Sequence, residues 1–334
     1  MLSTRRIAAA LAVSALVLAG CSDKDDILDS LPTDEASEPS DQATEPTDSD
    51  TPPSEVEALI SDEGMPSIIE EDGIVTLDFE GATEPDELQV SIVEEGDGVA
   101  VTREDMVFVD YAGMVWGSDE TFDSSYERGA PTSFPLSGVV QGWRDGLAGQ
   151  KVGSRVIISV PTELGYGPNG GQPTAGIGPD DTIVFVVDII GSLSPDASGD
   201  ADAEEITPVD ELPIEIEGGL GEMTSITVKD GAESPEEESS IIVAESDGNP
   251  VGGSGTTVYI QYSAATWDNS QKESTADFGG VQNTTIGGGT VFDQLEGIPV
   301  GSRVLLLVPG TETAPGLAAL VDIVGQLEAP EATE

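Results

Sequence analysis

Apolar residues in two long stretches of this chain recur with a period of two or stand in short unbroken runs. Valine, valine and tyrosine alternate with other residues over 107–111, and unbroken apolar runs occur within 156–160 and 183–187. Side chains of a β-strand point alternately to the two faces of a sheet, so these patterns are typical of strands. Gly, Pro and Asp bound the segments. We therefore predict a protein built mainly from short strands.

One stretch between the predicted strands has a different period. Val140, Trp143 and Leu147 are separated by three and four residues, a spacing that places them on one face of a helix. We expect this single short helix to press Trp143 into the sheet. The predicted fold class is α+β, with an antiparallel β-sheet wrapped around one short helix.

Acidic stretches divide the chain into parts. Residues 22–64 consist largely of Asp, Glu, Ser, Thr and Pro, and such a segment cannot bury enough apolar surface to offset its chain entropy. Residues 194–211 have the same character. The predicted parts are a signal peptide (1–20), a disordered acidic tether (21–64), a first domain (65–191), an acidic linker (192–211), a second domain (212–327) and a tail (328–334).

The two predicted domains resemble each other, which favours an internal duplication over two unrelated domains. Four landmarks recur in the same order. They are, first copy before second, 76–79 and 225–228, 109–111 and 260–262, 153–156 and 301–304, and 187–191 and 321–325.

A short apolar run near the start of the chain ends at its one cysteine. Arg5 and Arg6 precede the run, and Leu-Ala-Gly leads directly to Cys21. The run over 7–19 is too short to span a bilayer, and small residues before Cys21 are typical of a processing site. The segment resembles a bacterial lipoprotein signal, which implies a lipid on Cys21 and anchoring at the outer side of the cell membrane. The alternative is an ordinary signal peptide with an incidental cysteine.

The composition restricts the chemistry. The chain has 65 acidic and 11 basic residues, a formal charge of −54, and no histidine. Nucleic acid and anionic lipid head groups repel such a protein. With no imidazole, and with its thiol lipidated, the chain cannot form a Ser-His-Asp triad or a Cys/His zinc site, so we expect no metal and no cofactor. The acidity fits solubility at a cell surface or calcium capture, although no stretch follows the spaced aspartates of a calcium loop.

Several separated motifs in the first domain together resemble one enzyme family. They lie between Leu88 and Gly191 and are, in order, Tyr111, 122–125, 134–136, 139–143, 153–155, 166–167 and 182–185. They resemble the FKBP-type peptidyl-prolyl cis-trans isomerases. The resemblance implies two tandem FKBP-like domains, proline-containing exported polypeptides as substrates and macrolides as inhibitors.

The chemistry of such an enzyme requires no acid or base. Rotation about an X-Pro bond meets a barrier of ~18–20 kcal/mol because the twisted amide loses resonance. A dry aromatic cup that holds the proline, with a few fixed polar groups that prefer the twisted geometry, is sufficient. Unaided, these bonds take tens of seconds to relax, which limits refolding of exported proteins.

The resemblance also implies a role for each site residue. Trp143 would form the floor beneath the proline ring, Tyr166 would direct its hydroxyl to a substrate carbonyl, and Asp123 would lie beside the twisting carbonyl. The wall, substrate-binding and flap residues would be Tyr111, Phe122, Phe134, Val139, Val140, Ile177 and Phe185. Thr132 stands where many members carry an aromatic residue. Taken singly, the aromatic residues fit an ordinary core and 122–125 fits a turn; their order and spacing favour the pocket.

The second copy differs at these positions. With an offset of 151, Glu273 and Ser274 replace Phe122 and Asp123. With the offset of 148 at the Gly-Ser-Arg-Val landmark, Val291 replaces Trp143. The offset then falls from 148 to 134, so fourteen residues are missing where the first copy carries its flap. We predict a degenerate domain without isomerase activity.

Two functions remain open at this stage. One is a lipid-anchored isomerase that acts on exported proteins, which the pocket residues favour. The other is a surface-anchored binding module or chaperone that keeps only the fold, which the altered second copy and Thr132 favour.

Overall fold

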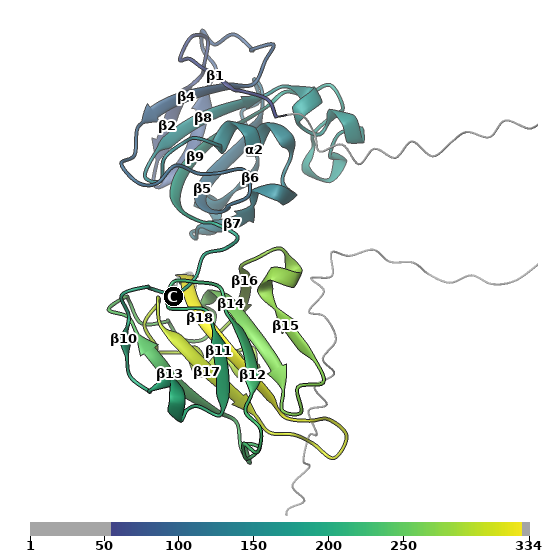
Figure 1. Cartoon of the computed structure of the whole chain (residues 1–334). Coiled ribbons are helices and arrows are strands. Elements are labelled where there is room, and N and C mark those ends of the chain that lie inside the picture. Colours follow the sequence, from purple (N-terminus) through teal and green to yellow (C-terminus); the bar gives the residue numbers. More distant parts are fainter. Residues whose placement is uncertain (1–54, 329–334) are drawn as a thin grey trace, which may run out of the picture. The chain divides into compact units, whose positions relative to one another are not determined.

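The computed structural model describes residues 55–328 (Figure 1). The signal segment with Cys21, most of the predicted tether and most of the tail lie outside the described residues. Within 55–328, no helix is both long enough and apolar enough to cross a membrane.

The predicted strands form a first sheet, coloured purple to teal in Figure 1. Residues 107–111, 156–160 and 183–187 all lie in its strands. In order across the sheet these are β1 (Leu59–Ile60), β4 (Gln89–Glu94), β8 (Arg155–Val160), β9 (Ile183–Leu193), β5 (Met106–Val115) and β6 (Thr121–Ser124), with β7 (Thr132–Pro135) also paired to β5. The pairs are antiparallel except β1 with β4, which is parallel. The sheet is therefore mixed rather than purely antiparallel.

The predicted helix forms as α2 (Gln141–Leu147), with Trp143 and Leu147 buried. Its glycines allow it to lie close to the sheet, because a Cβ added to Gly142 would stand 2.3 Å from a methyl carbon of Val160. A further helix, α1 (Ser125–Arg128), was not predicted from the sequence; the Ser124 side chain caps it and Gly129 ends it in the left-handed conformation. The 3-10 turns of this half are η1 (Leu136–Gly138), η2 (Thr162–Leu164), η3 (Gly167–Asn169) and η4 (Pro173–Ala175).

A second sheet, green to yellow in Figure 1, repeats the strand order of the first. Its strands are β10 (Glu204–Glu205), β13 (Ser239–Glu245), β17 (Arg303–Val308), β18 (Leu317–Leu327), β14 (Thr257–Thr266) and β15 (Lys272–Ser274), with β16 (Gln282–Thr285) also on β14. Its 3-10 turns are η5 (Val209–Glu211), η6 (Thr275–Phe278) and η7 (Val291–Leu295). Where the sequence predicted a second short α-helix, the structure has the 3-10 turn η7.

Each sheet is covered on its other face by a hairpin that lies outside the recognised motifs. The hairpins are β2 (Ser67–Glu71) with β3 (Ile74–Asp78), and β11 (Ile214–Glu217) with β12 (Ser225–Val228). In β9, Ile183, Phe185 and Val187 pack in the core that contains Trp143, whereas Val184 and Val186 pack against the hairpin. Burial on both faces explains why this run is continuously apolar.

The repeated Gly-Ser-Arg motif fastens these hairpins to their sheets. Arg155 bonds Asp188 and reaches Glu70 of β2 at 3.1 Å. Arg303 bonds Asp322 and donates to the carbonyls of Gly219 and Glu222, in the loop between β11 and β12, at 2.9 and 3.1 Å. The second ion pair is the more deeply buried of the two, with each side chain only 4 % exposed.

The structure shifts two predicted boundaries. The folded chain begins before residue 65, because β1 pairs with β4 and the preceding residues lie on the first core. The acidic stretch 192–211 is not without structure either: β9 extends to Leu193, and β10 pairs with β13. Backbone pairing to an existing sheet edge offsets chain entropy that the composition of these segments alone could not.

Candidate functional site

Five aromatic side chains of the first sheet meet around Trp143. Ring centroids lie 5.1 Å from Trp143 for Phe134, 6.0 Å for Phe185 and 6.2 Å for Tyr111. The pairs Tyr111–Phe134 and Phe122–Phe185 are 5.4 and 5.6 Å apart, and all five contacts are edge-on. Trp143, Tyr111 and Phe185 are buried, whereas Phe122 and Phe134 are partly exposed. The cluster therefore has a buried floor and an accessible rim.

A β-bulge brings two consecutive residues of β6 to this cluster. Asp123 pairs with Gly113 of β5, whereas the next pair in register is Met114 with Thr121, so Phe122 is one extra residue on β6. A regular strand sends neighbouring side chains to opposite faces; a bulge re-aims one of them, and bulges are common beside active sites. Phe122 thus reaches Phe185 while Asp123 reaches Tyr111.

Gly113 leaves the space that Phe122 and Phe185 occupy. A Cβ at this position would stand 2.6 Å from the Phe122 ring and 2.8 Å from the Phe185 ring. Any larger residue would displace one of the two rings, so the aromatic wall depends on glycine here.

Polar groups line one edge of the cluster. The Tyr111 hydroxyl donates to Asp123 and accepts from Arg128 Nη2 at 3.1 Å, and Arg128 also forms an ion pair with Asp123. The Arg128 guanidinium lies 5.5 Å from the centre of the Tyr111 ring, within cation–π range. Burial, together with the hydrogen bond to Asp123, raises the pKa of Tyr111 to about 12.

Sequence reasoning did not single out Arg128. It lies in α1, which the sequence analysis did not predict, and it also donates to Thr132 Oγ1 at 3.2 Å. Thr132, the position where an aromatic residue was expected, therefore serves as a hydrogen-bond acceptor at the rim. A basic residue five positions after the acidic Asp123 was the available signal.

The remaining predicted residues also contact this core. Val139, Val140 and Tyr166 are partly buried against it, and Ile177 is 2 % exposed within it. The Tyr166 hydroxyl has no hydrogen-bond partner within residues 55–328, so it is free to bond a ligand. Burial and the nearby charge of Asp123 raise the pKa of Tyr166.

The second sheet keeps the tyrosine and acid of this arrangement. Tyr262 donates to Glu273 Oε1 at 3.2 Å, and Glu273 pairs with Ala264 as Asp123 pairs with Gly113. Glu273 therefore stands in the place of Asp123, and the expectation that it replaces Phe122 was wrong. The offset falls from 151 to 150 because β15 lacks the bulge, so Phe122 has no counterpart there.

The second sheet lacks the aromatic walls and floor. Ala319 pairs with Ala264 where Phe185 pairs with Gly113. The backbone bonds that follow α2 and η7, from Gln150 to Leu147 and from Ile298 to Leu295, keep the offset of 148, which puts Val291 at the place of Trp143. Residues 309–316 join β17 to β18 directly, with no counterpart of η2, η3 and η4.

The first sheet thus presents an apolar cup with a polar edge. Aromatic surfaces can enclose a small aliphatic ring and exclude water from it. The ionic edge of Asp123 and Arg128 and the free hydroxyl of Tyr166 can orient a polar group on that ring. This arrangement suits binding and distortion of a ligand rather than nucleophilic attack.

Comparison with known proteins identifies the same part of the chain. The family model for FKBP-type peptidyl-prolyl cis-trans isomerases matches residues 98–190. A probable FK506-binding protein of Corynebacterium glutamicum is 42% identical over 87 residues, which cover 26% of this chain and 70% of that protein. The Escherichia coli isomerase FkpA is 41% identical over 103 residues, which cover 30% of this chain and 37% of FkpA.

The solved structures that match also cover only part of the chain. The crystal structure of FkpA from Escherichia coli has 39% sequence identity, covers 32% of this chain and 48% of that chain, and gives a TM-score of 0.30. The chain thus spans less than half of FkpA, and the family match lies wholly within the first sheet and its connections.

Proposed function

Because the chain belongs to the FKBP-type peptidyl-prolyl cis-trans isomerases, we propose that its first sheet isomerises X-Pro bonds in exported polypeptides. The observation that carries the proposal is the aromatic cup around Trp143, with Asp123 and Tyr166 at its edge. The proposed substrates are proline-containing segments of unfolded chains, and FK506-like macrolides are proposed as competing ligands.

The proposed mechanism uses binding alone. The proline ring would rest on Trp143 between Tyr111, Phe122 and Phe185, where water is excluded. The twisted amide is less polar than the planar one, so it loses less on leaving water, and its barrier falls. Tyr166 would hold a substrate carbonyl through its free hydroxyl, while Arg128 fixes the Asp123 carboxylate beside the twisting carbonyl.

The second sheet is proposed to be a degenerate FKBP-like domain that binds or spaces rather than catalyses. Its strand order repeats that of the first sheet. Val291, Ala319 and the direct 309–316 connection stand where the first sheet has its floor, a wall and its flap. These replacements support a fold kept after the catalytic pocket was lost.

The first prediction tests the isomerase and its mechanism together. Turnover of a short X-Pro peptide, followed by NMR exchange, is expected to be constant from about pH 6 to 8, because carboxyl groups ordinarily titrate near 4 and tyrosines near 10. Both pocket tyrosines have raised pKa values, that of Tyr111 to about 12, so they stay protonated throughout this range. The chain has no histidine. A bell-shaped profile would contradict a mechanism without acid or base, and absent turnover would contradict the proposed function.

We further propose that the protein is a lipoprotein at the outer side of the cell membrane. The supporting observation is the sequence that ends at Cys21, the chain's one cysteine. The charge of −54 fits this location, because a lipid would hold the protein at a surface whose anionic head groups repel it.

The second prediction tests the anchor. Cys21→Ser removes the acceptor sulfur, so the protein is expected to leave the membrane fraction or to accumulate unprocessed. Fractionation of cells after a detergent-free wash, with immunodetection, measures this. Ser22→Ala is the matched control and should leave the distribution unchanged. Full membrane retention of the Cys21→Ser protein would contradict the lipid anchor.

A further inference from the structure

Residues 55–60, called the strap below, lie beside the helix that carries Trp143. The backbone of Leu59 donates to the Leu88 carbonyl at 2.9 Å, and β1 adds to the edge of the sheet. Val56 and Ala58 pack against the same core as Trp143. The strap lies before the residues that the family model matches.

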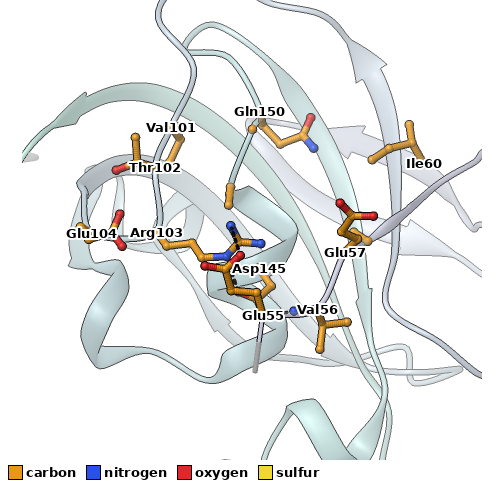
Figure 2. A pocket seen from close by; sticks show the side chains of 13 residues that line it. Glu55, Val56, Glu57, Ile60, Val101, Thr102, Arg103, Glu104, Asp145 and Gln150 are labelled. Atoms are coloured by element: carbon orange, nitrogen blue, oxygen red, sulfur yellow. Dashed lines mark hydrogen bonds and ion pairs between the residues drawn. The ribbon is translucent and has the colours of Figure 1, made fainter. Parts of the chain in front are cut away.

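One carboxylate of α2 joins the strap to the helix. Asp145 follows Trp143 by two residues, and its side chain has no solvent exposure. Oδ1 accepts from Arg103 Nε at 2.9 Å and from Arg144 Nε at 3.1 Å. Oδ2 accepts from the Val56 backbone N–H at 3.1 Å and from Gln141 Nε2 at 3.2 Å. Figure 2 shows Arg103, Val56 and Glu55 gathered around this carboxylate.

The strap is therefore part of a buried charge network. Burial acts to raise the pKa of Asp145, but the hydrogen bonds from Arg144 and Arg103 outweigh it, and the pKa lies below its ordinary value. The group is thus a buried anion at neutral pH, and a buried anion needs its donors. Withdrawing the Val56 N–H would leave Oδ2 with fewer partners and force the helix or the arginines to adjust.

The helix depends on such contacts for its position. It has seven residues, too few for an isolated helix to be stable in water. Gly142 and Gly146 contact the sheet with no side chain of their own to interlock with it. Trp143 makes three aromatic contacts, each at the edge of a ring. A small rotation of α2 would therefore displace the floor of the cup.

The strap is held at few points along its length. A cavity of about 630 Å³ lies beside it, lined by strap residues together with Arg103, Asp145, Ala148 and Gln150 (Figure 2). None of its lining residues belongs to the aromatic cluster. Because the cavity removes packing that would otherwise hold the strap, the Val56–Asp145 hydrogen bond carries much of its attachment to α2.

We propose that the strap fixes α2 through Asp145 and so sets the position of Trp143. Val56, through its backbone N–H, and Asp145 are positioning residues, since neither lies in the cup. The inference rests on the proposed function only in that Trp143 is taken as the floor of the substrate site. The segment that precedes the domain therefore acts on the site that follows it.

The test compares two substitutions at one position in the full chain. Val56→Pro removes the N–H that Asp145 accepts, whereas Val56→Ala keeps it. The indole ¹H–¹⁵N signals of Trp116, Trp143 and Trp267 are recorded, with that of Trp143 identified by Trp143→Phe. In Val56→Pro, the Trp143 signal is expected to shift or broaden while the other two stay in place. kcat/KM is expected to fall about three- to tenfold, the range for losing one hydrogen bond to a charged group.

Control variants separate positioning from general destabilisation. Val56→Ala is expected to keep both the Trp143 signal and kcat/KM within about twofold of wild type. Glu55→Gln should do the same, because Glu55 is 73 % exposed and lies 3.5 Å from Arg103. If Val56→Pro does not fold, Asp145→Asn is used, and the same shift of the Trp143 signal is expected.

The outcomes are distinct. A Trp143 signal unchanged in folded Val56→Pro, or changed equally by Val56→Ala, would overturn the strap. A Trp143 signal that moves in a protein whose wild type has no isomerase activity would refute the proposed function and leave the strap supported.

Discussion

Replacing Trp143 with leucine is expected to lower kcat/KM for X-Pro isomerisation by more than tenfold, equivalent to about 1.4 kcal/mol or more of lost transition-state binding. Trp143 is the residue on which Tyr111, Phe134 and Phe185 converge, and it is 4 % exposed. Leucine keeps an apolar side chain there but removes the flat surface on which the proline ring would rest. NMR exchange on a short X-Pro peptide measures the effect.

Trp116→Leu provides a matched control in the same half of the protein. Trp116 packs on Phe79, with ring centroids 5.3 Å apart, in the core between the sheet and its hairpin. It makes no contact with the cup. Since truncating a buried tryptophan to alanine costs about 3–5 kcal/mol, both leucine variants are first checked for folding by circular dichroism. Full activity in folded Trp143→Leu, or equal losses in the two variants, would show that the cup is not the site.

The sequence predicted those features that depend on local periodicity. The alternation over 107–111 and the runs at 156–160 and 183–187 all became strands, because burial on two faces selects apolar residues wherever the strand lies. The spacing of Val140, Trp143 and Leu147 likewise predicted α2 almost to its ends. The order of separated aromatic residues was then enough to assemble the cup.

Features that depend on one residue or on distant partners were not predictable in this way. The bulge at Phe122 adds a single residue, which a period of two cannot register over a strand of four residues. This is why Glu273 was aligned with Phe122 rather than with Asp123. The strap has a strongly acidic composition, and its order comes from pairing with β4 and from a carboxylate 89 residues further along the chain.

Asp322→Asn is expected to destabilise the second half by about 3–5 kcal/mol, because removing one partner of a buried ion pair leaves the other charge uncompensated. Arg303 and Asp322 are each 4 % exposed, and Arg303 Nε and Nη2 bond the two carboxylate oxygens at 2.6 and 2.8 Å. The neutral amide can accept from only one of these donors. Urea unfolding, followed through the indole NMR signal of Trp267, measures the change.

Asp188→Asn is the matched control, because it breaks the equivalent pair with Arg155 in the first half, where both side chains are 27 % exposed. Water can replace the lost acceptor there, so the cost should be much smaller. Equal costs would mean that burial does not decide the strength of these pairs. Below the unfolding transition, Asp322→Asn is also expected to keep full isomerase activity, since no residue of the cup lies beyond Phe185 in the chain. A loss of turnover in parallel with unfolding of the second half would instead show that catalysis depends on it.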